Sequence, residues 1–193
     1  MRRWIFLGLG CLAVNSCAAA PVLHYTLAAP PQATASSALG RQPIVIVVDR
    51  VSLPDALDSD DMMVRHGNVL ERSHSGRWAS RLSLGVTDLV TALLARSRPD
   101  ALVTDEPQMT PASYRISINI SLLDLAVVAG AAGGSATLEA DWLVVPGDAS
   151  KPPLRDRAHV SISGPVGTDQ DVAALTAVVL TQLAAQIDIS KLR

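Results

Sequence analysis

Side chains that could hold a metal ion or perform acid–base chemistry gather near the middle of the chain. The chain has four histidines: His24, His66, His74 and His159. Two of them, His66 and His74, lie close in sequence to Asp60, Asp61 and Glu71, so the residue types of a metal site occur together. No two histidines have the spacing of the helical zinc-protease motif. We therefore expect surface histidines on a hairpin and no metal site.

The sequence also lacks the motifs of nucleophilic catalysis and of nucleotide binding. No serine lies in a Gly-x-Ser-x-Gly motif. Residues 130–134 (GAAGG) do not match Gly-x-Gly-x-x-Gly, and they fall between two expected antiparallel strands. We expect a flexible hairpin tip over residues 126–135, whose apolar composition leaves open a contact with a partner or with lipid. The sequence thus predicts no catalytic residue, no cofactor and a protein that is not an enzyme.

A modification site is expected at Cys17. Residues 1–3 carry two arginines, and the apolar run over residues 4–14 is shorter than the roughly 20 residues that cross a bilayer. The run leads into LAVNSC at residues 12–17, which resembles the lipobox of bacterial lipoproteins; Val14 and Ser16 fit, and Asn15 is less common. In that motif a peptidase cuts before the cysteine, and the thiol carries a diacylglyceryl group. Residues 1–16 would then be a lipoprotein signal peptide.

The alternative for this segment is an ordinary secretory signal that is cut within residues 18–20, with Cys17 lost. Cysteine content favours lipidation, because Cys11 and Cys17 are the only cysteines and cleavage before Cys17 leaves no other thiol. An unpaired thiol would be an oxidation liability in the periplasm, whereas a thioether-linked cysteine is not. Ala18 stands where such lipoproteins carry Asp when they stay in the inner membrane. We therefore expect anchoring to the outer membrane.

Length and charge narrow the classes of protein further. Removing the first 16 of 193 residues leaves 177, enough for one domain with its own core. Since Arg2 and Arg3 leave with the signal, the remainder has 14 basic and 18 acidic residues. This net charge of −4 argues against binding nucleic acid or an anionic membrane surface. No second long apolar run follows, so we expect no transmembrane helix after the signal.

The first half of the chain predicts a short strand, a linker and the start of a domain. Residues 22–27 are typical of a strand, and residues 28–43, rich in Ala, Pro, Ser and Gln, of a flexible linker. We expect a lipid-anchored segment over residues 17–43 and a single domain over residues 44–193. The β-branched run 44–48 suits a strand buried on both faces. A hairpin is expected to turn at Gly67-Asn68, and a helix to run from near Ser80 to Pro99.

The second half has the clearest periodicity. A short strand is expected at residues 101–103. Alternation of apolar and polar residues over 114–122, 136–144 and 157–163 then predicts three strands that pair as an antiparallel meander. Thr168 can cap a final helix with an apolar stripe. The expected fold is α+β and two-layered: a mainly antiparallel sheet with two amphipathic helices packed on one face.

Two further residues are candidates for binding a partner. Trp78 precedes the first expected helix, where it either staples the helix start to the sheet as a core residue or contacts another subunit of an assembly. Arg65 lies in an expected strand. A solvated arginine is the ordinary interpretation there, and a partner contact is the alternative.

The order of several short motifs resembles the PqiC/YmbA-type family of ABC-transport auxiliary lipoproteins. After the lipid cysteine come YTL (residues 25–27), IVVDRVSLP (46–54), MVR (63–65) and a hairpin that ends in RWA (77–79). An amphipathic helix, a long strand, a strand with Trp142 and a C-terminal Ala/Leu helix complete the order. The chain departs from the family where Ser80-Arg81-Leu82 replaces Glu-Pro-Leu, and in the apolar tip at residues 129–135.

The resemblance implies a role in intermembrane lipid transport. Family members lie on the periplasmic face of the outer membrane and meet a tunnel-forming MCE-domain protein that is anchored in the inner membrane. In this chain Cys17 would hold the domain at the membrane, and residues 28–43 would set its reach at about 20 Å. The implied role is docking without catalysis, with assembly into a homo-oligomeric ring as a further expectation.

Two other hypotheses stay open. The chain could be a lipoprotein subunit of another envelope machine, for lipopolysaccharide assembly or secretion, and the partner recovered on purification would separate these cases. A periplasmic hydrolase is the third hypothesis, although the sequence has no nucleophile–base motif. Loss of an activity on a single Ser or His substitution would support it.

Overall fold

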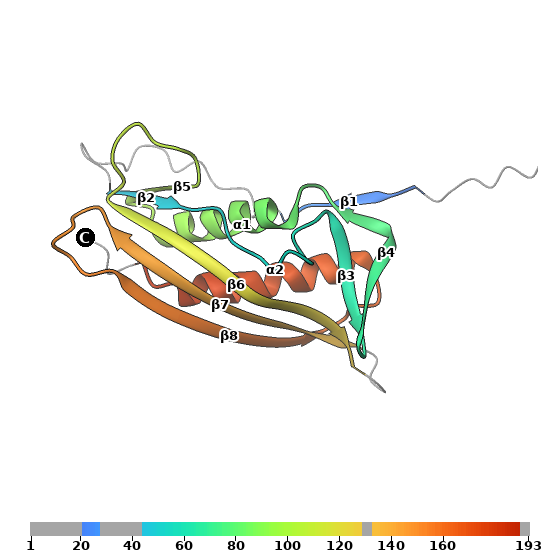
Figure 1. Ribbon diagram of the computed structural model, residues 1–193. Helices are drawn as coiled ribbons and strands as arrows, with labels where there is room; N and C mark the ends of the chain where they lie inside the picture. Colours follow the sequence, from blue (N-terminus) through green and yellow to red (C-terminus); the bar gives the residue numbers. More distant parts are fainter. Residues whose placement is uncertain (1–20, 28–43, 129–132, 190–193) are drawn as a thin grey trace, which may run out of the picture.

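The described part of the chain forms one sheet of eight strands with two helices against it (Figure 1). The computed structural model describes residues 21–27, 44–128 and 133–189. The strands are β1 (Leu23–Tyr25), β2 (Ile44–Val48), β3 (Asp61–His66), β4 (Val69–Trp78), β5 (Ala101–Thr104), β6 (Tyr114–Val127), β7 (Gly134–Pro146) and β8 (Leu154–Gly164), and the helices are α1 (Leu82–Ser97) and α2 (Asp169–Gln186). The α+β class and the predicted order of elements are confirmed.

The strand pairing differs from the expected one. The strands follow the order β1-β4-β3-β6-β2-β5, and β7 lies between β6 and β8. Of the seven pairings among the described strands, four are parallel: β1–β4, β3–β6, β2–β6 and β2–β5. The other three, β3–β4, β6–β7 and β7–β8, are antiparallel. The sheet is therefore mixed, and the expectation of a mainly antiparallel sheet is wrong, although the meander β6-β7-β8 is confirmed.

The cause of this error lies in β2. All its residues after Ile44 are buried, as predicted, and burial on both faces is typical of strands with parallel neighbours. β2 pairs with β5 through Ile44↔Ala101 and with β6 through Ile46↔Tyr114. These partners are distant in sequence, and the alternation within a strand does not reveal which strand lies beside it. The assumption that consecutive strands pair holds only for the meander and the β3–β4 hairpin.

One edge of β6 is shared by two strands. Its other edge pairs with β7 along nearly the whole strand. The shared edge pairs with β2 near its start and with Ser52 at Asn119, but with β3 only at Arg65↔Ala126. The sheet therefore opens between Asn119 and Ala126, and β3 and β4 diverge from β6 there (Figure 1).

A β-bulge at Ser121 changes which residues of β6 face the core. Ile120 and Leu122 pair with adjacent residues of β7, so Ser121 is the additional residue. Before the bulge the even-numbered residues of β6 are buried, and after it Leu123 and Leu125 are buried. The sequence pattern placed Leu122 on the buried face; the extra residue reverses the alternation and leaves Leu122 half-buried.

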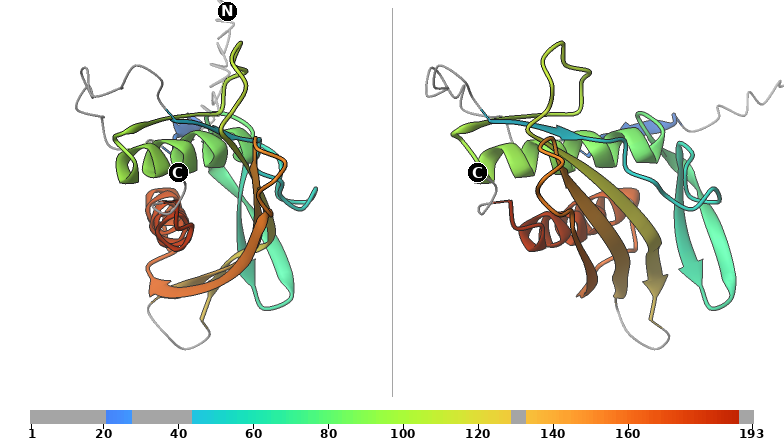
Figure 2. Two further views of the ribbon diagram at one scale, coloured as in Figure 1. Left: turned by 90° about the vertical axis from the view of Figure 1, so that its left-hand side faces the viewer. Right: turned by 60° about the vertical axis from the view of Figure 1, so that its left-hand side comes forward.

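Both helices lie on the concave face of the curved sheet, as expected (Figure 2). α2 contacts β7 and β8 and also packs against α1. Its predicted stripe, including Leu175, Val179 and Leu183, is buried. Thr168 caps α2 as predicted: its hydroxyl accepts a hydrogen bond from the Asp171 N–H, and the Asp171 carboxylate accepts one from the Thr168 N–H, both at 3.1 Å.

The N-terminus of α1 is capped from a distant loop. Arg81 occupies the cap position and makes no side-chain cap hydrogen bond. The Asp58 carboxylate instead accepts from the Ser83 N–H at 3.1 Å and pairs with Arg81 at 3.3 Å. Burial raises the pKa of Asp58, but the hydrogen bonds from Ser83 and the charge of Arg81 outweigh it, so the net shift is downward. The loop before β3 is thereby fastened to the start of α1.

The short strand predicted near the N-terminus belongs to the same sheet. β1 pairs with β4 from Leu23↔Gly76 to Tyr25↔Trp78, and Leu27 is buried in the core. The folded part of the chain thus begins before Ile44, where the domain was expected to start. Cys17 with its signal segment, and the expected linker over residues 28–43, lie outside the described residues. Among the residues the structure describes, no helix is both long and apolar enough to cross a bilayer.

Candidate binding site between β3 and β6

A cavity of about 250 Å³ lies where the sheet opens between β3 and β6. Arg65 and Trp78, the two candidates from the sequence, both line it. Its walls are mainly apolar. Representative side chains are Met63 and Leu70 from the hairpin, Leu123 and Leu125 from β6, and Leu82 and Val172 from the two helices. The structure therefore brings the two candidate residues to one site.

Arg65 joins the hairpin to β6. Its Nε donates to both carboxylate oxygens of Asp124, at 2.8 and 3.0 Å. The side chains of Arg65 and Asp124 are 38% and 22% exposed, so the ion pair lies at the mouth of the cavity and not in the core. The ordinary interpretation of a solvated arginine is thus incomplete, because the guanidinium is half-exposed and also holds two strands together.

Trp78 lies at the end of β4 and is only 5% exposed. Its backbone N–H donates to the backbone carbonyl of Asp60 at 2.7 Å, and it pairs with Tyr25 of β1. It is part of the main core cluster together with Leu82 of α1. Its position fits a core residue that connects the hairpin to the helix, and a partner molecule would reach it through the cavity of which it forms a wall.

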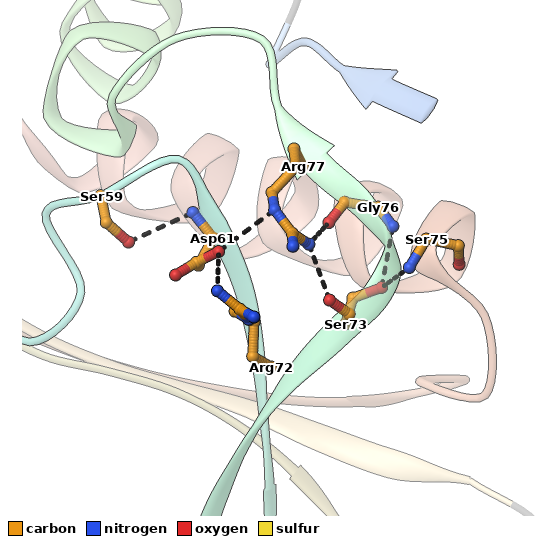
Figure 3. Close-up of polar contacts among 7 residues, drawn as sticks. All are labelled: Ser59, Asp61, Arg72, Ser73, Ser75, Gly76 and Arg77. Carbon is orange, nitrogen blue, oxygen red and sulfur yellow. Dashed lines mark hydrogen bonds and ion pairs between the residues drawn. The ribbon is translucent and has the colours of Figure 1, made fainter. Parts of the chain in front are cut away.

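A polar network beside the cavity holds the two strands of the hairpin together (Figure 3). The Asp61 carboxylate pairs with Arg77 at 3.2 Å and with Arg72 at 3.6 Å. Arg77, whose side chain is 18% exposed, also donates to the carbonyls of Ser73 and Gly76 at 2.7 and 2.6 Å. One guanidinium thus satisfies two backbone carbonyls and a carboxylate.

The part of β4 that Arg77 supports is a bulge. Residues 73–76 stand opposite a single residue of β3. The Ser75 hydroxyl donates to the Asp169 carboxylate at 2.8 Å, and a Cβ on Gly76 would lie 2.5 Å from the Asp169 side chain. The bulge therefore fits against the first turn of α2, and its closest approach requires a glycine.

The histidines that suggested metal binding lie on this hairpin but do not converge. The His66 imidazole lies 3.6 Å from the Glu71 carboxylate, and both side chains are at least half exposed. Within the described ranges, no group of three His, Cys, Asp or Glu side chains is placed to hold a metal ion. His66 and Glu71 form an exposed pair across the hairpin.

The outer face of the meander is polar, in contrast to the cavity. The Asp141 carboxylate accepts from the Asn119 amide at 3.0 Å and pairs with Arg155 at 3.2 Å. These contacts, the Asn119 hydrogen bond first, lower the pKa of Asp141. Two residues away on β7, the Glu139 carboxylate lies 3.3 Å from the His159 imidazole of β8. Charges on this face are paired with one another across neighbouring strands.

Arg65 could be proposed from the sequence, but its partner Asp124 could not. Asp124 is 59 residues away in sequence, and the pair arises because β3 lies beside the end of β6. No spacing within the chain predicts such a contact. The side chains of β6 that line the cavity could not be predicted either, because of the bulge at Ser121. Strict alternation would bury Leu122, whereas the bulge buries Leu123 and Leu125.

Comparison with known proteins links this arrangement to a family. The family model for the ABC-type transport auxiliary lipoprotein component matches residues 25–188. The match therefore extends from β1 to just beyond α2. No curated protein has a matching sequence.

Two solved structures have a similar fold. An uncharacterized protein matches with a TM-score of 0.59 and 15% sequence identity, over 74% of this chain and 88% of that chain. Protein XCC0632 from Xanthomonas campestris, of the family DUF330, matches with a TM-score of 0.58 and 18% identity, over 78% of this chain and 84% of that chain. At such low identities the similarity concerns the fold alone.

Proposed function

Since the chain belongs to the family of ABC-type transport auxiliary lipoprotein components, we propose that it serves an MCE-type intermembrane lipid transport system. In this role it is anchored to the outer membrane through Cys17 and faces the periplasm. It docks the tunnel-forming MCE-domain protein of the inner membrane and catalyses no reaction. No cofactor and no nucleic acid take part.

The extent of the family match carries this proposal. The match includes both helices and all strands from β2 onward, so it covers the elements that surround the cavity. The lipobox at residues 12–17 and the motif order supply the more specific expectations of an outer-membrane anchor and an MCE partner. A docking role also agrees with a site whose charged groups are paired with one another.

The proposed docking surface is the end of the molecule that carries the hairpin turn. Val69 and Leu70 are 64% and 37% exposed there, and Val127 and Val128 are 36% and 44% exposed at the end of β6. Because β3 and β6 are parallel and pair at Arg65↔Ala126, the two apolar groups lie at the same end. Arg65 adds a charged residue beside them. Exposed apolar side chains with a polar rim are typical of protein-binding surfaces. Residues 129–132 of the expected hairpin tip lie outside the described residues.

An in-cell crosslink tests the proposed partner. Tagged full-length protein is crosslinked in cells and extracted with detergent, and the co-purifying proteins are identified by mass spectrometry. We expect an MCE-domain protein, and its crosslinks should map to the hairpin end. Recovery of lipopolysaccharide-assembly or secretion components would move the function to another envelope machine. Light scattering on the extracted protein tests the further expectation of self-association.

The anchor has its own test, with a matched control in the chain. We expect Cys17→Ser to release the protein from the membrane fraction, because two or more acyl chains give stable attachment and their loss leaves none. Cys11→Ser lies within the signal segment and should leave the protein in membranes. Membrane fractionation followed by immunoblotting measures both. Retention of the Cys17→Ser protein would show that another element anchors it.

A further inference from the structure

Apart from the outer guanidinium nitrogens of Arg65 at the mouth, the polar side chains around the cavity leave a ligand little to hydrogen-bond with. Asp124 already accepts from Arg65, and Asp61 pairs with Arg77. The Thr176 hydroxyl donates to the carbonyl of Val172 at 2.7 Å, within its own helix. Ser121 donates to the carbonyl of Glu139 at 3.3 Å. A polar ligand would lose its hydration without replacement here, whereas an apolar ligand would lose nothing.

The cavity is lined from the sheet and from both helices. Met63 and Leu122 contribute from β3 and β6, and Leu82 and Val172 from α1 and α2. Arg65 and Asp124 stand at the mouth as a neutral ion pair, so the entrance offers no net charge to attract an ionic group. The site is therefore a mainly apolar cavity with an electrically balanced opening.

The volume distinguishes between the apolar groups that could enter. An apolar cavity of about 150 Å³ binds benzene, which has six carbon atoms, so on the same scale 250 Å³ holds about ten. A Leu or Ile side chain from a docked protein has four carbons and a Phe side chain has seven, so each would leave part of this cavity empty. Tyr and Trp side chains would bring a polar O–H or N–H into a mainly apolar space. We propose that the cavity between β3 and β6 binds an aliphatic chain, the acyl tail of a membrane lipid, with its head group outside the mouth.

This inference goes beyond the proposed docking role, because it gives the protein a direct lipid contact that does not depend on the MCE partner. Trp78 forms part of the cavity wall and supplies a built-in reporter. Bromine atoms on an alkyl chain quench tryptophan fluorescence at short range. Full-length protein carrying Trp4→Phe and Trp142→Phe, so that Trp78 is its single tryptophan, is purified in dodecyl maltoside and then exchanged into brominated dodecyl maltoside. It should lose Trp78 emission severalfold.

Two variants show whether the chain enters the cavity. Ala56 is exposed in the loop before β3 and lines the cavity, so Ala56→Phe fills the space without disturbing the core. Ala149→Phe, on an exposed loop away from the cavity, is the matched control. We expect Ala56→Phe to abolish the quenching and Ala149→Phe to retain it. Unquenched Trp78, or equal quenching in the two variants, would overturn the proposal.

A photo-crosslink in cells separates an acyl tail from a partner's side chain. Leu122→p-benzoylphenylalanine places a reactive group at the cavity, and Val69→p-benzoylphenylalanine places one at the hairpin turn as a control. The proposal predicts adducts of lipid mass at position 122 in the intact protein, including in cells that lack the crosslinked partner protein. A polypeptide adduct at position 122 would assign the cavity to protein docking and refute the acyl-chain site. A failed partner search together with a lipid adduct would refute only the proposed function.

Discussion

The meander β6-β7-β8 and the hairpin β3–β4 are attached to the molecule in different ways. β7 pairs with β6 and β8 along nearly its whole length, and α2 covers the inner face. The hairpin pairs with β6 at one position, Arg65↔Ala126, and is otherwise attached by β1, by an ion pair to Asp124, by the hydrogen bond from Ser75 to Asp169 and by two buried side chains, Met62 and Trp78. The meander is attached by continuous strand pairing and buried apolar area, whereas the hairpin is attached at a few points, several of them partly exposed polar contacts.

This difference in attachment indicates that the hairpin can move more easily than the meander. Segments with few buried apolar contacts open locally at lower free energy than core strands do. The cavity lies at the junction of the two regions, so its width depends on how firmly the hairpin is held. A cavity with a rigid wall, formed by β6, and an adjustable wall, formed by the hairpin, can admit ligands of different shape while the sheet stays folded.

The largest difference between the two regions is expected in the stability lost when an apolar side chain is truncated. Leu138 of β7 is fully buried, so Leu138→Ala should lower the free energy of unfolding by about 2–5 kcal/mol. Met63 of β3 is half-buried and already borders a cavity, so Met63→Ala should cost about 1 kcal/mol or less. Urea unfolding followed by circular dichroism measures both. Equal losses would mean that the hairpin is as much a part of the core as the meander is.

The next largest effect is expected within the hairpin, at Arg77. Its replacement in Arg77→Met leaves two carbonyls and the Asp61 carboxylate without their donor, which should cost about 1.5–3 kcal/mol. Arg72 reaches the same carboxylate at 3.6 Å with its side chain 59% exposed, so Arg72→Met should cost less than about 0.5 kcal/mol. Thermal or urea unfolding compares the two. If Arg72→Met lowered the free energy of unfolding more than Arg77→Met did, Arg77 would not be the residue that supports the bulge.

A smaller and local effect is expected where the hairpin meets β6. In a double-mutant cycle, Arg65→Gln and Asp124→Asn should show a coupling of about 0.5–1 kcal/mol, because the pair is partly exposed. Hydrogen exchange should become faster for the amides of β3 in either variant while those of β7 keep their protection. Faster exchange spread evenly over both strands would argue against two separately held regions.

The smallest effect is a pH dependence on the meander. Hydrogen bonding from Asn119 and the charge of Arg155 lower the pKa of Asp141 below its usual value of 3.8, so the folded state binds this proton less readily than the unfolded state. The resulting stability is present above the unfolded pKa and is lost as pH falls through the lower, folded pKa. The difference in unfolding free energy between wild type and Asp141→Asn should therefore be constant above about pH 5 and shrink below about pH 4.

A suitable comparison for that experiment is Asp156→Asn on β8, whose carboxylate accepts from the neighbouring Arg157 N–H. Urea midpoints are measured for the three proteins from pH 3 to pH 7. If the gap between wild type and Asp141→Asn widened toward acid pH, the sign of the proposed linkage would be wrong.

The same contrast explains what the sequence could predict. The meander was predicted from alternation, because each of its strands has one buried face and pairs with its neighbour in the chain. The Thr168 cap was predicted because its partner, Asp171, is three residues away. These features depend on residues close in sequence, or on a pattern within one strand.

The region around the cavity depends on distant residues. Arg65 meets Asp124 through a parallel pairing, and Asp58 caps α1 from a separate loop. The bulge at Ser121 follows from the fit of β6 to its neighbours and leaves no mark in the alternation of the sequence itself. Arg65 and Trp78 could therefore be proposed as candidates from the sequence, but the cavity that joins them could not.

The place of β1 in the sheet fixes how far the domain can stand from a bilayer. Residues 28–43 connect β1 to β2, two strands of one sheet, so their length adds nothing between the anchor and the fold. With the proposed anchor at Cys17, five residues remain before β1 begins, and five extended residues span at most about 18 Å. With that anchor, the folded domain would begin within about 18 Å of the membrane surface.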